Sequence, residues 1–417
     1  SVTAIKLSPA SVGSNGQVLG VNGSGALQWV TDSGTPGAGT ITAAMISSGL
    51  KLVTTDAQNN VVVGINAGDS FSGTDAERNI LIGTDAGTKI TTGDRNIGIG
   101  LGALDETTTG NYNIAIGDSA LYANSTASNN TAIGNSALLS NTTANDNTAV
   151  GYLALDANTT GNCNTAIGRG ALGANTTAQS NTAVGSNCLT SNTTGTSNTG
   201  LGRDALVLNT TGNYNTAVGH LALDANTTAN HNTAFGYNVL TTNSTGTQNT
   251  GLGSNSLNAN TTGNNNTGLG YHSLAANTTG ANNTAIGYTA LDANTTAWSN
   301  TAFGAYALSA NTTGQNNIAI GVSALVLNTT GGSNIAIGDE ALDANTTGEG
   351  NTSVGKASLS SNTTASQNTA VGFLSLTANT TGARNTAFGS YALETNTTGD
   401  DNLAIGYEAL ELNTTGL

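Results

Sequence analysis

A glycine that follows a pair of small or apolar residues returns every seventeenth residue along most of this chain. It stands at Gly83, Gly100 and Gly117 and continues without insertion or deletion to Gly406, which makes twenty copies and (406 − 83)/17 = 19 equal intervals. A short fixed period of this kind indicates a solenoid, because one repeat cannot bury its apolar face alone and must do so against its neighbours. The period therefore restricts the possible folds to stacked repeats.

Two further rows of residues share the period. Leucine recurs from Leu104 to Leu410, and an Asn-Thr-Thr or Asn-Ser-Thr triplet recurs from Asn124 to Asn413, giving the consensus N-T-A-[IVFL]-G-x-x-A-L-x-x-N-T-T-[GA]-x-x. Seventeen residues are too few for a helical hairpin, and 56 glycines with β-branched threonine in the repeat oppose helices. We therefore predict an all-β chain, a parallel β-solenoid of about twenty coils with one β segment at NTAIG and a second at ALxxNTT. At a spacing of about 4.8 Å per coil, the rod is on the order of 95 Å long.

The period divides the chain into two parts. Residues 1–60 lack it and are rich in glycine and serine, which predicts a separate connector or attachment region, whereas residues 61–417 form the repeat shaft. The interval from Gly64 to Gly83 is nineteen residues, so the first coil carries a two-residue insertion.

The residue types allowed in each row indicate which rows face inward. The row before glycine holds Ile, Val, Phe or Leu, so we expect it to fill the interior together with the leucine row, with Leu223 and Phe235 buried near one another. The alanine row, which includes Ala115 and Ala132, is small enough to lie where chain packs on chain or strand on turn. Because such a core is thin, we expect other copies of the chain to complete it, in a homotrimer.

The recurring asparagines and threonines have a structural interpretation. Asparagines at Asn113, Asn130 and each seventeenth residue after them should stack as a ladder of amides, with a second ladder at the triplet asparagines and hydroxyl rows at the threonines. The triplets also match the N-glycosylation sequon, but the repeat register explains them. Ice binding is a distant alternative, because adjacent threonines in N-T-T should point to opposite faces of a strand.

Charge and hydropathy oppose several partners. Nine Lys and Arg stand against 24 Asp and Glu, a formal charge of −15, so we expect no binding to nucleic acid or to an anionic membrane. No apolar run approaches the roughly 18 residues of a membrane span. Ser1 does not open a signal peptide, and we expect any export or anchoring element to lie outside this sequence.

Residues that could carry out catalysis are dispersed. The row after leucine holds five aspartates: Asp105, Asp156, Asp224, Asp292 and Asp343. They are three or four coils apart, which is too far along the rod for two of them to act as the paired carboxyls of a glycosidase. Only Glu394 and Glu411 occupy that row on neighbouring coils. These two glutamates, near Asp400, Asp401 and Glu408, favour a solvated acidic end over a catalytic site, and a cation that bridges them is the intermediate alternative. We therefore predict no enzymatic activity, no cofactor and no metal.

Histidines and cysteines give no further site. The three histidines fall in three different rows, so they predict no metal-ligand cluster: His220, His231 and His272. Cys163 and Cys188 also occupy different rows and should remain unpaired thiols. Filling of a bend by aromatic residues is the favoured interpretation of the recurring tyrosines, and surface contact with a ligand such as a sugar is the alternative. The candidates for such contacts are Trp298, Tyr152, Tyr237, Tyr271, Tyr288 and Tyr407.

Two parts of the sequence resemble known families. The unit N-T-A-I-G-x-x-A-L resembles the head repeat of YadA-like trimeric autotransporter adhesins, which implies a trimeric left-handed parallel β-roll, although the period is longer here and the NTTG turn is added. The segment GSNGQVLGVNGSGALQWV resembles a segment of phage tail-fibre proteins. The residues that match are Gly16, Gln17, Val18, Leu19, Gly23, Gly25, Leu27 and Trp29.

These resemblances imply a structural fibre. The leading hypothesis is the shaft of a phage tail or side fibre in a virion, which meets a glycan or protein receptor on a host cell through one terminus. A bacterial surface adhesin of the autotransporter class is the alternative.

Overall fold

The protein is described by a computed structural model over residues 17–21, 27–31, 56–72 and 75–416. In the region before the repeats, β1 (Gln17–Val21) pairs antiparallel with β2 (Leu27–Thr31). Most other residues of the predicted 1–60 region lie outside the described residues.

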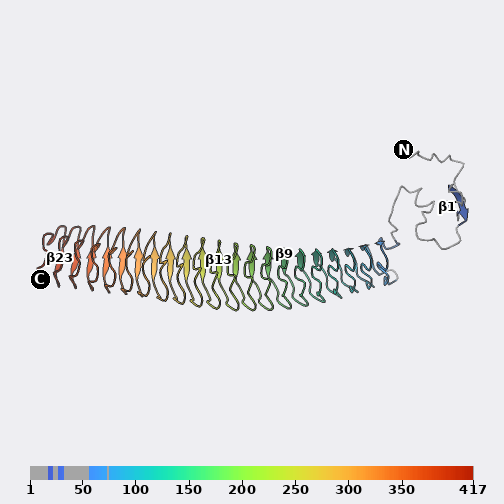
Figure 1. Ribbon diagram of the computed structural model, residues 1–417, viewed down its shortest axis with the longest axis horizontal. Coiled ribbons are helices and arrows are strands. Elements are labelled where there is room, and N and C mark those ends of the chain that lie inside the picture. The colour runs from blue at the N-terminus through green and yellow to red at the C-terminus, as the bar shows by residue number, and fades with distance from the viewer. Residues whose placement is uncertain (1–16, 22–26, 32–55, 73–74, 417) are drawn as a thin grey trace.

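The repeats form a long, gently curved rod built from one parallel sheet (Figure 1). Its 21 strands, β3 to β23, each have three residues, and each strand pairs in register with the next, so that only β3 and β23 have a single partner among them. Strands β3 and β23 lie at opposite ends of the rod (Figure 1). The predicted parallel β-solenoid is confirmed.

The strands of the rod have these bounds: β3 (Val61–Val63), β4 (Ile80–Ile82), β5 (Ile97–Ile99), β6 (Ile114–Ile116), β7 (Thr131–Ile133), β8 (Thr148–Val150), β9 (Thr165–Ile167), β10 (Thr182–Val184), β11 (Thr199–Leu201), β12 (Thr216–Val218), β13 (Thr233–Phe235), β14 (Thr250–Leu252), β15 (Thr267–Leu269), β16 (Thr284–Ile286), β17 (Thr301–Phe303), β18 (Ile318–Ile320), β19 (Ile335–Ile337), β20 (Thr352–Val354), β21 (Thr369–Val371), β22 (Thr386–Phe388) and β23 (Leu403–Ile405).

The predicted second β segment is wrong, because ALxxNTT forms turns in every coil. In the coil that begins at β6, Ser119, Leu121 and Asn129 have φ values of 54°, 54° and 61°. Left-handed residues of this kind bend the chain sharply and interrupt the extended backbone that a strand needs. The same positions are left-handed in neighbouring coils, so each coil has one strand and two bent sides.

The glycine row is required by the stacking of the coils. Gly117 has a φ of 140°, and a Cβ there would lie 2.4 Å from the carbonyl oxygen of Gly134 in the next coil. No side chain fits at that separation, and L residues rarely adopt this backbone conformation. The invariance of glycine follows from both restrictions together.

The predicted inward position of the row before glycine is also wrong. In β13 (Thr233–Phe235), Ala234 is fully buried, whereas Phe235 is 53% exposed and Leu223 is fully buried. Successive strand residues point to opposite faces, so an inward alanine leaves both Thr233 and Phe235 facing outward. Alanine and not phenylalanine faces inward because the coil interior is narrow and the leucine row already occupies the space that faces the strand.

Packing inside the coil explains why the middle strand residue is small. At Gly98, which replaces alanine in β5 (Ile97–Ile99), a Cβ would meet Leu81 Cδ2 at 3.1 Å, the Ala103 carbonyl oxygen at 3.3 Å and Leu104 Cδ1 at 3.3 Å. The middle row therefore packs strand on turn within one chain, which was one of the two predicted placements. The inward leucine row is confirmed.

Two buried ladders of asparagine join the coils, as predicted. Before each strand, Asn113 Oδ1 accepts the backbone N–H of Asn130 at 3.1 Å, while Asn113 Nδ2 donates to the Ala127 carbonyl at 2.9 Å. In the triplet row, Asn141 Nδ2 donates to Asn124 Oδ1 at 3.1 Å and to the Ala144 carbonyl at 3.0 Å. The side chains satisfy backbone groups that the bends leave without partners.

The first threonine of each triplet also bonds between coils. Thr142 Oγ1 donates to the Thr159 carbonyl at 3.1 Å, and the same bond recurs along the row. The predicted hydroxyl rows are therefore bonded to backbone carbonyls instead of to one another. The second threonine of the triplet faces solvent.

Replacement of one ladder asparagine by its charged isostere tests the ladder. Asn266 Nδ2 donates to the Gly280 carbonyl at 2.8 Å and Asn266 Oδ1 accepts the Asn283 N–H at 3.0 Å. Asn266→Asp cannot donate and buries a charge, so we expect the free energy of unfolding to fall by at least about 2 kcal/mol. Urea denaturation measures the change. Asn265→Asp, at the exposed neighbour, is the matched control, and equal effects of the two substitutions would contradict the ladder.

Candidate functional site

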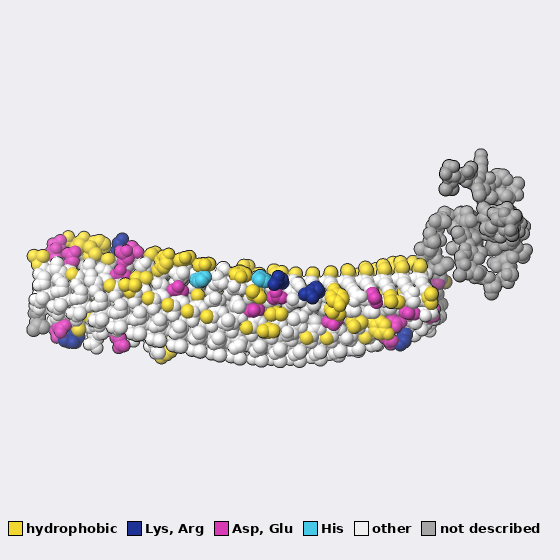
Figure 2. Space-filling model, viewed as in Figure 1, with side chains coloured by type: hydrophobic (Ala, Val, Ile, Leu, Met, Phe, Trp, Pro, Cys, Tyr) yellow, Lys and Arg dark blue, Asp and Glu magenta, His cyan; other side chains and the backbone are white. Residues whose placement is uncertain are grey.

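One apolar row runs along the outside of the sheet. We call the third residues of strands β3 to β23, from Val63 to Ile405, the apolar stripe; they are all Ile, Val, Leu or Phe, and all are half-buried or exposed. Hydrophobic side chains line one long edge of the rod in Figure 2. None of the three positions of these 21 strands carries a charged residue. Sequence reasoning assigned this row to the core because it considered residue type and not the alternation of strand faces.

The six predicted ligand-contact residues are all on the surface, with 44% to 69% of each side chain exposed. They are not gathered into one site. Tyr271 and Tyr288 lie on adjacent coils, and Trp298 lies on the same coil as Tyr288, between β16 and β17. Three lie on other coils: Tyr152, Tyr237 and Tyr407. The tyrosines that follow the glycine row are exposed at the bend, with about half or more of each residue accessible to solvent.

Several of the tyrosines are stacked along the rod. Tyr271 and Tyr288 lie 5.5 Å apart between ring centroids at 13°, and Tyr237 stacks on His220 at 5.7 Å and 16°. Tyr407 meets Tyr391 edge to face at 6.0 Å. A ring face that is covered by another ring is not free to stack on a sugar. These stacked tyrosines are better suited to stabilising adjacent coils than to binding a ligand.

Tyr152 and Trp298 differ from the stacked rings. Neither has an aromatic neighbour within the described part of the chain. A polar hollow of about 220 Å³ lies on the turn side of the rod, and one of its lining residues, Asn316, donates its backbone N–H to the Trp298 carbonyl at 3.2 Å. The hollow is lined by Thr313, Gln315, Asn316, Thr330, Gly332, Ser333 and Glu349. Sequence reasoning missed the hollow, although Gly332 in a row of larger residues was a usable signal.

The aspartates of the row after leucine are half-buried. Burial raises the pKa of the Asp156, Asp224, Asp292 and Asp343 carboxyls above the ordinary range. One oxygen of Asp224 and one of Asp343 are buried without a hydrogen-bond partner. The four lie on well separated coils, so they do not assemble a paired-carboxyl site.

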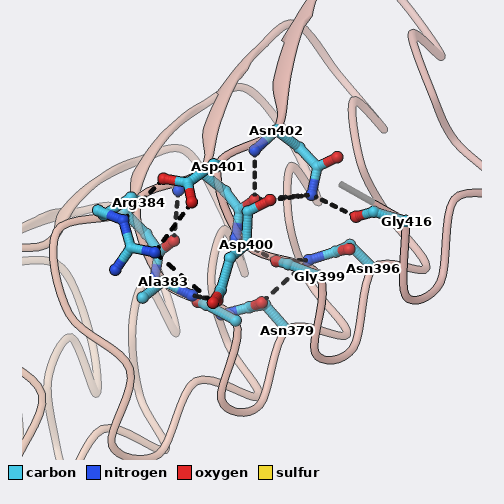
Figure 3. A network of polar contacts seen from close by, with 12 residues as sticks. Asn379, Ala383, Arg384, Asn396, Gly399, Asp400, Asp401, Asn402 and Gly416 are labelled. Carbon is cyan, nitrogen blue, oxygen red and sulfur yellow. Dashed lines mark hydrogen bonds and ion pairs between the residues drawn. The ribbon is translucent and has the colours of Figure 1, made fainter.

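The acidic C-terminal coils contain an ion-pair network that includes Arg384 (Figure 3). Arg384 Nε lies 2.7 Å from Asp401 Oδ1, and Arg384 Nη2 lies 3.6 Å from Asp400 Oδ2. Asp400 Oδ1 also accepts the Ala383 N–H at 2.7 Å. The guanidinium lowers the pKa of Asp401. These carboxylates are thus occupied by protein donors, and Glu394 and Glu411 are not part of the network in Figure 3.

Over the residues that the structure describes, no group of three or more His, Cys, Asp or Glu side chains is arranged to hold a metal. The same residues include no helix long and apolar enough to cross a bilayer. Cys163 is an exposed free thiol and Cys188 a buried one, as predicted. Burial raises the pKa of Cys188 to about 12, which makes it unreactive.

Comparison of the chain with protein-family models, with curated proteins and with solved structures gave no match. The resemblances to autotransporter heads and to tail-fibre segments therefore stay predictions.

The four half-buried aspartates predict a pH dependence of stability. Since their native pKa values lie above those of the unfolded chain, the folded state binds more protons, and stability falls as pH rises from about 4 through the native pKa values. Replacing all four with asparagine should reduce the loss of stability between pH 4.5 and pH 7, measured as the urea midpoint. Asp118→Asn, at an exposed aspartate, is the control, and an unchanged pH slope in the fourfold variant would contradict the assignment.

Proposed function

We propose that residues 61–417 are the passive shaft of a structural fibre, without enzymatic activity, that holds a binding terminus at a distance from its point of attachment. The observation that carries the proposal is the in-register stacking of 21 three-residue strands, which gives a rod on the order of 95 Å long. A repeated structural unit of this kind provides length, and its coils can be added or removed without redesign.

The resemblances support a particular setting for the fibre. A phage tail or side fibre in a virion is the leading proposal, with a glycan or protein receptor on the host surface as partner. A bacterial surface adhesin of the autotransporter class is the alternative. The coding sequence after Leu417 discriminates between them, because a membrane-anchor barrel indicates the adhesin and a receptor-binding tip or chaperone domain indicates the phage fibre.

We infer that the shaft is a homotrimer joined through the apolar stripe. The stripe is uncharged and runs the length of the rod, so a band about 10 Å wide and 95 Å long would cover on the order of 1,000 Å² per chain, compared with about 800 Å² per partner in a standard interface. Its exposed residues are large for a solvent-facing row, with Phe235, Phe303 and Phe388 all more than half exposed. Exposed apolar surface of this extent is typical of a protein interface.

Light scattering tests the assembly. We expect the wild-type chain to have three times its 41.1 kDa mass. Replacing Phe235, Phe303 and Phe388 by threonine should shift the mass towards the monomer because the stripe loses its largest side chains. The control replaces Leu208 and Leu327, which are about half exposed but lie outside the strands, by threonine. A wild-type monomer, or equal loss of mass in both variants, would count against the stripe as interface.

Deletion of whole coils tests the passive shaft. Removing residues 203–219 should preserve fold and cell binding and shorten the rod by about 4.8 Å, since the remaining coils stay in register. Removing sixteen or eighteen residues instead should disrupt stacking, because every inward residue then shifts relative to the next coil. Electron microscopy gives rod length, and a cell-binding assay gives function. Binding that declines in proportion to the number of coils removed anywhere in the rod would overturn the proposal.

Ice binding remains the distant alternative. The strands present one threonine row and one apolar row to solvent, as in β7 (Thr131–Ile133), and the first triplet threonine is committed to the next coil. Only single rows of threonine are therefore available, in place of a wide hydroxyl array.

A further inference from the structure

A third row of side chains links the coils on the turn side of the rod, and sequence reasoning did not identify it. We call it the capping row: it follows the Gly or Ala after each triplet and runs from Glu77 through Asp94 to Asp400. In the capping row, a side-chain oxygen accepts the backbone N–H of the same position in the preceding coil. Asn145 Oδ1 accepts the Ser128 N–H at 2.7 Å, and Asn230 Oδ1 accepts the Asn213 N–H at 2.7 Å.

The capping row is interrupted over five successive coils. Ala281, Trp298, Gln315, Gly332 and Glu349 accept no such bond, whereas the caps resume when Ser366 Oγ accepts the Glu349 N–H at 3.0 Å. In the described part of the chain, five backbone N–H groups consequently have no acceptor from the protein: Asn264, Ala281, Trp298, Gln315 and Gly332. Elsewhere in the capping row, at most two successive coils lack the hydrogen bond.

The interruption coincides with the polar hollow and with the exposed Trp298. Gly332 has no side chain to fill the space between Gln315 and Glu349, and Thr313, Thr330 and Ser333 line the same space of about 220 Å³. This volume lies below the roughly 300–1,000 Å³ of pockets that enclose a drug-sized ligand, so it suits one small polar unit. The distance from Trp298 to Glu349 along the row is three coils, about 14 Å.

We propose that the surface from Trp298 to Glu349 binds a short neutral oligosaccharide. The uncapped N–H groups of Gln315 and Gly332 donate to sugar oxygens, the Glu349 carboxylate accepts from sugar hydroxyls, and the exposed Trp298 ring stacks on a neighbouring sugar. Glu349 and the formal charge of −15 disfavour acidic sugars. This site goes beyond the proposed function, because the rest of the shaft remains passive.

An extended peptide is a poorer fit to the same donors. A peptide that adds to an edge needs alternating donors and acceptors, but the carbonyls of the row are already used. Asn316 donates to the Trp298 carbonyl at 3.2 Å, Ser333 to the Gln315 carbonyl at 2.9 Å and Gly350 to the Gly332 carbonyl at 3.1 Å. The row therefore offers donors alone, which sugar oxygens can satisfy.

Titration of the whole chain with maltotriose, cellotriose, mannotriose and N,N′,N″-triacetylchitotriose, followed by calorimetry and saturation-transfer NMR, tests the site. We expect at least one of these saccharides to bind. Gly332→Asn should weaken its affinity at least tenfold, because asparagine both fills the hollow and caps the Gln315 N–H, as it does elsewhere in the row. Its Cβ would lie 3.2 Å from the Gln315 carbonyl oxygen, a close contact that requires a small backbone shift, and the same row position already holds asparagine at Asn213 and Asn230.

Two further variants complete the test. Trp298→Ala should lower the affinity, whereas Tyr152→Ala, at an exposed aromatic beside capped coils, should leave it unchanged. Equal melting temperatures establish that the variants are folded. Failure of all four saccharides to bind, binding that neither Gly332→Asn nor Trp298→Ala reduces, or equal loss in Tyr152→Ala would overturn the site. None of these outcomes affects the mass or the coil-deletion results that test the fibre.

Discussion

The buried asparagine ladders are the interaction on which the rest of the rod depends. Each coil bends sharply at the residues next to Asn130 and at Leu138, and the bends turn backbone N–H and carbonyl groups away from any strand partner. An amide side chain can accept and donate at once, which neither a carboxylate nor a hydroxyl does equally well in a dry site. The ladders therefore permit a coil of seventeen residues with a single three-residue strand.

The leucine row completes this arrangement. Leu138 is buried although its φ of 52° is costly for an L residue, of order 1–2 kcal/mol. Burial of the leucine side chain contributes about 1.5–3 kcal/mol, enough to offset that strain in each coil. Since every coil contacts only its neighbours, this balance between backbone strain and leucine burial recurs in each coil. The stability of the rod is therefore a sum over pairs of adjacent coils.

The sequence predicted which positions recur in every coil, but not always whether their side chains face the interior or the solvent. Period, fold class, the leucine interior and both amide ladders could be inferred, because each depends on one residue type held fixed through the repeat. The exposure of Phe235 and its row could not, since strand alternation allows either face inward and only the narrow interior decides for Ala234. The second strand was wrong because Leu138 is left-handed, which residue type does not indicate. The capping row varies in type, so only hydrogen bonds such as that from Ser128 to Asn145 identify it.

The direction of the hydrogen bonds has a mechanical consequence. Bonds between coils, such as that from Thr131 N–H to the Asn147 carbonyl, run along the rod, so a pull on its two ends loads successive coils in series. Each coil that detaches exchanges a rise of about 4.8 Å for seventeen extended residues, about 58 Å of chain. Coils that detach one at a time would lengthen the fibre stepwise under load, and single-molecule stretching would record that extension as steps of about 50 Å.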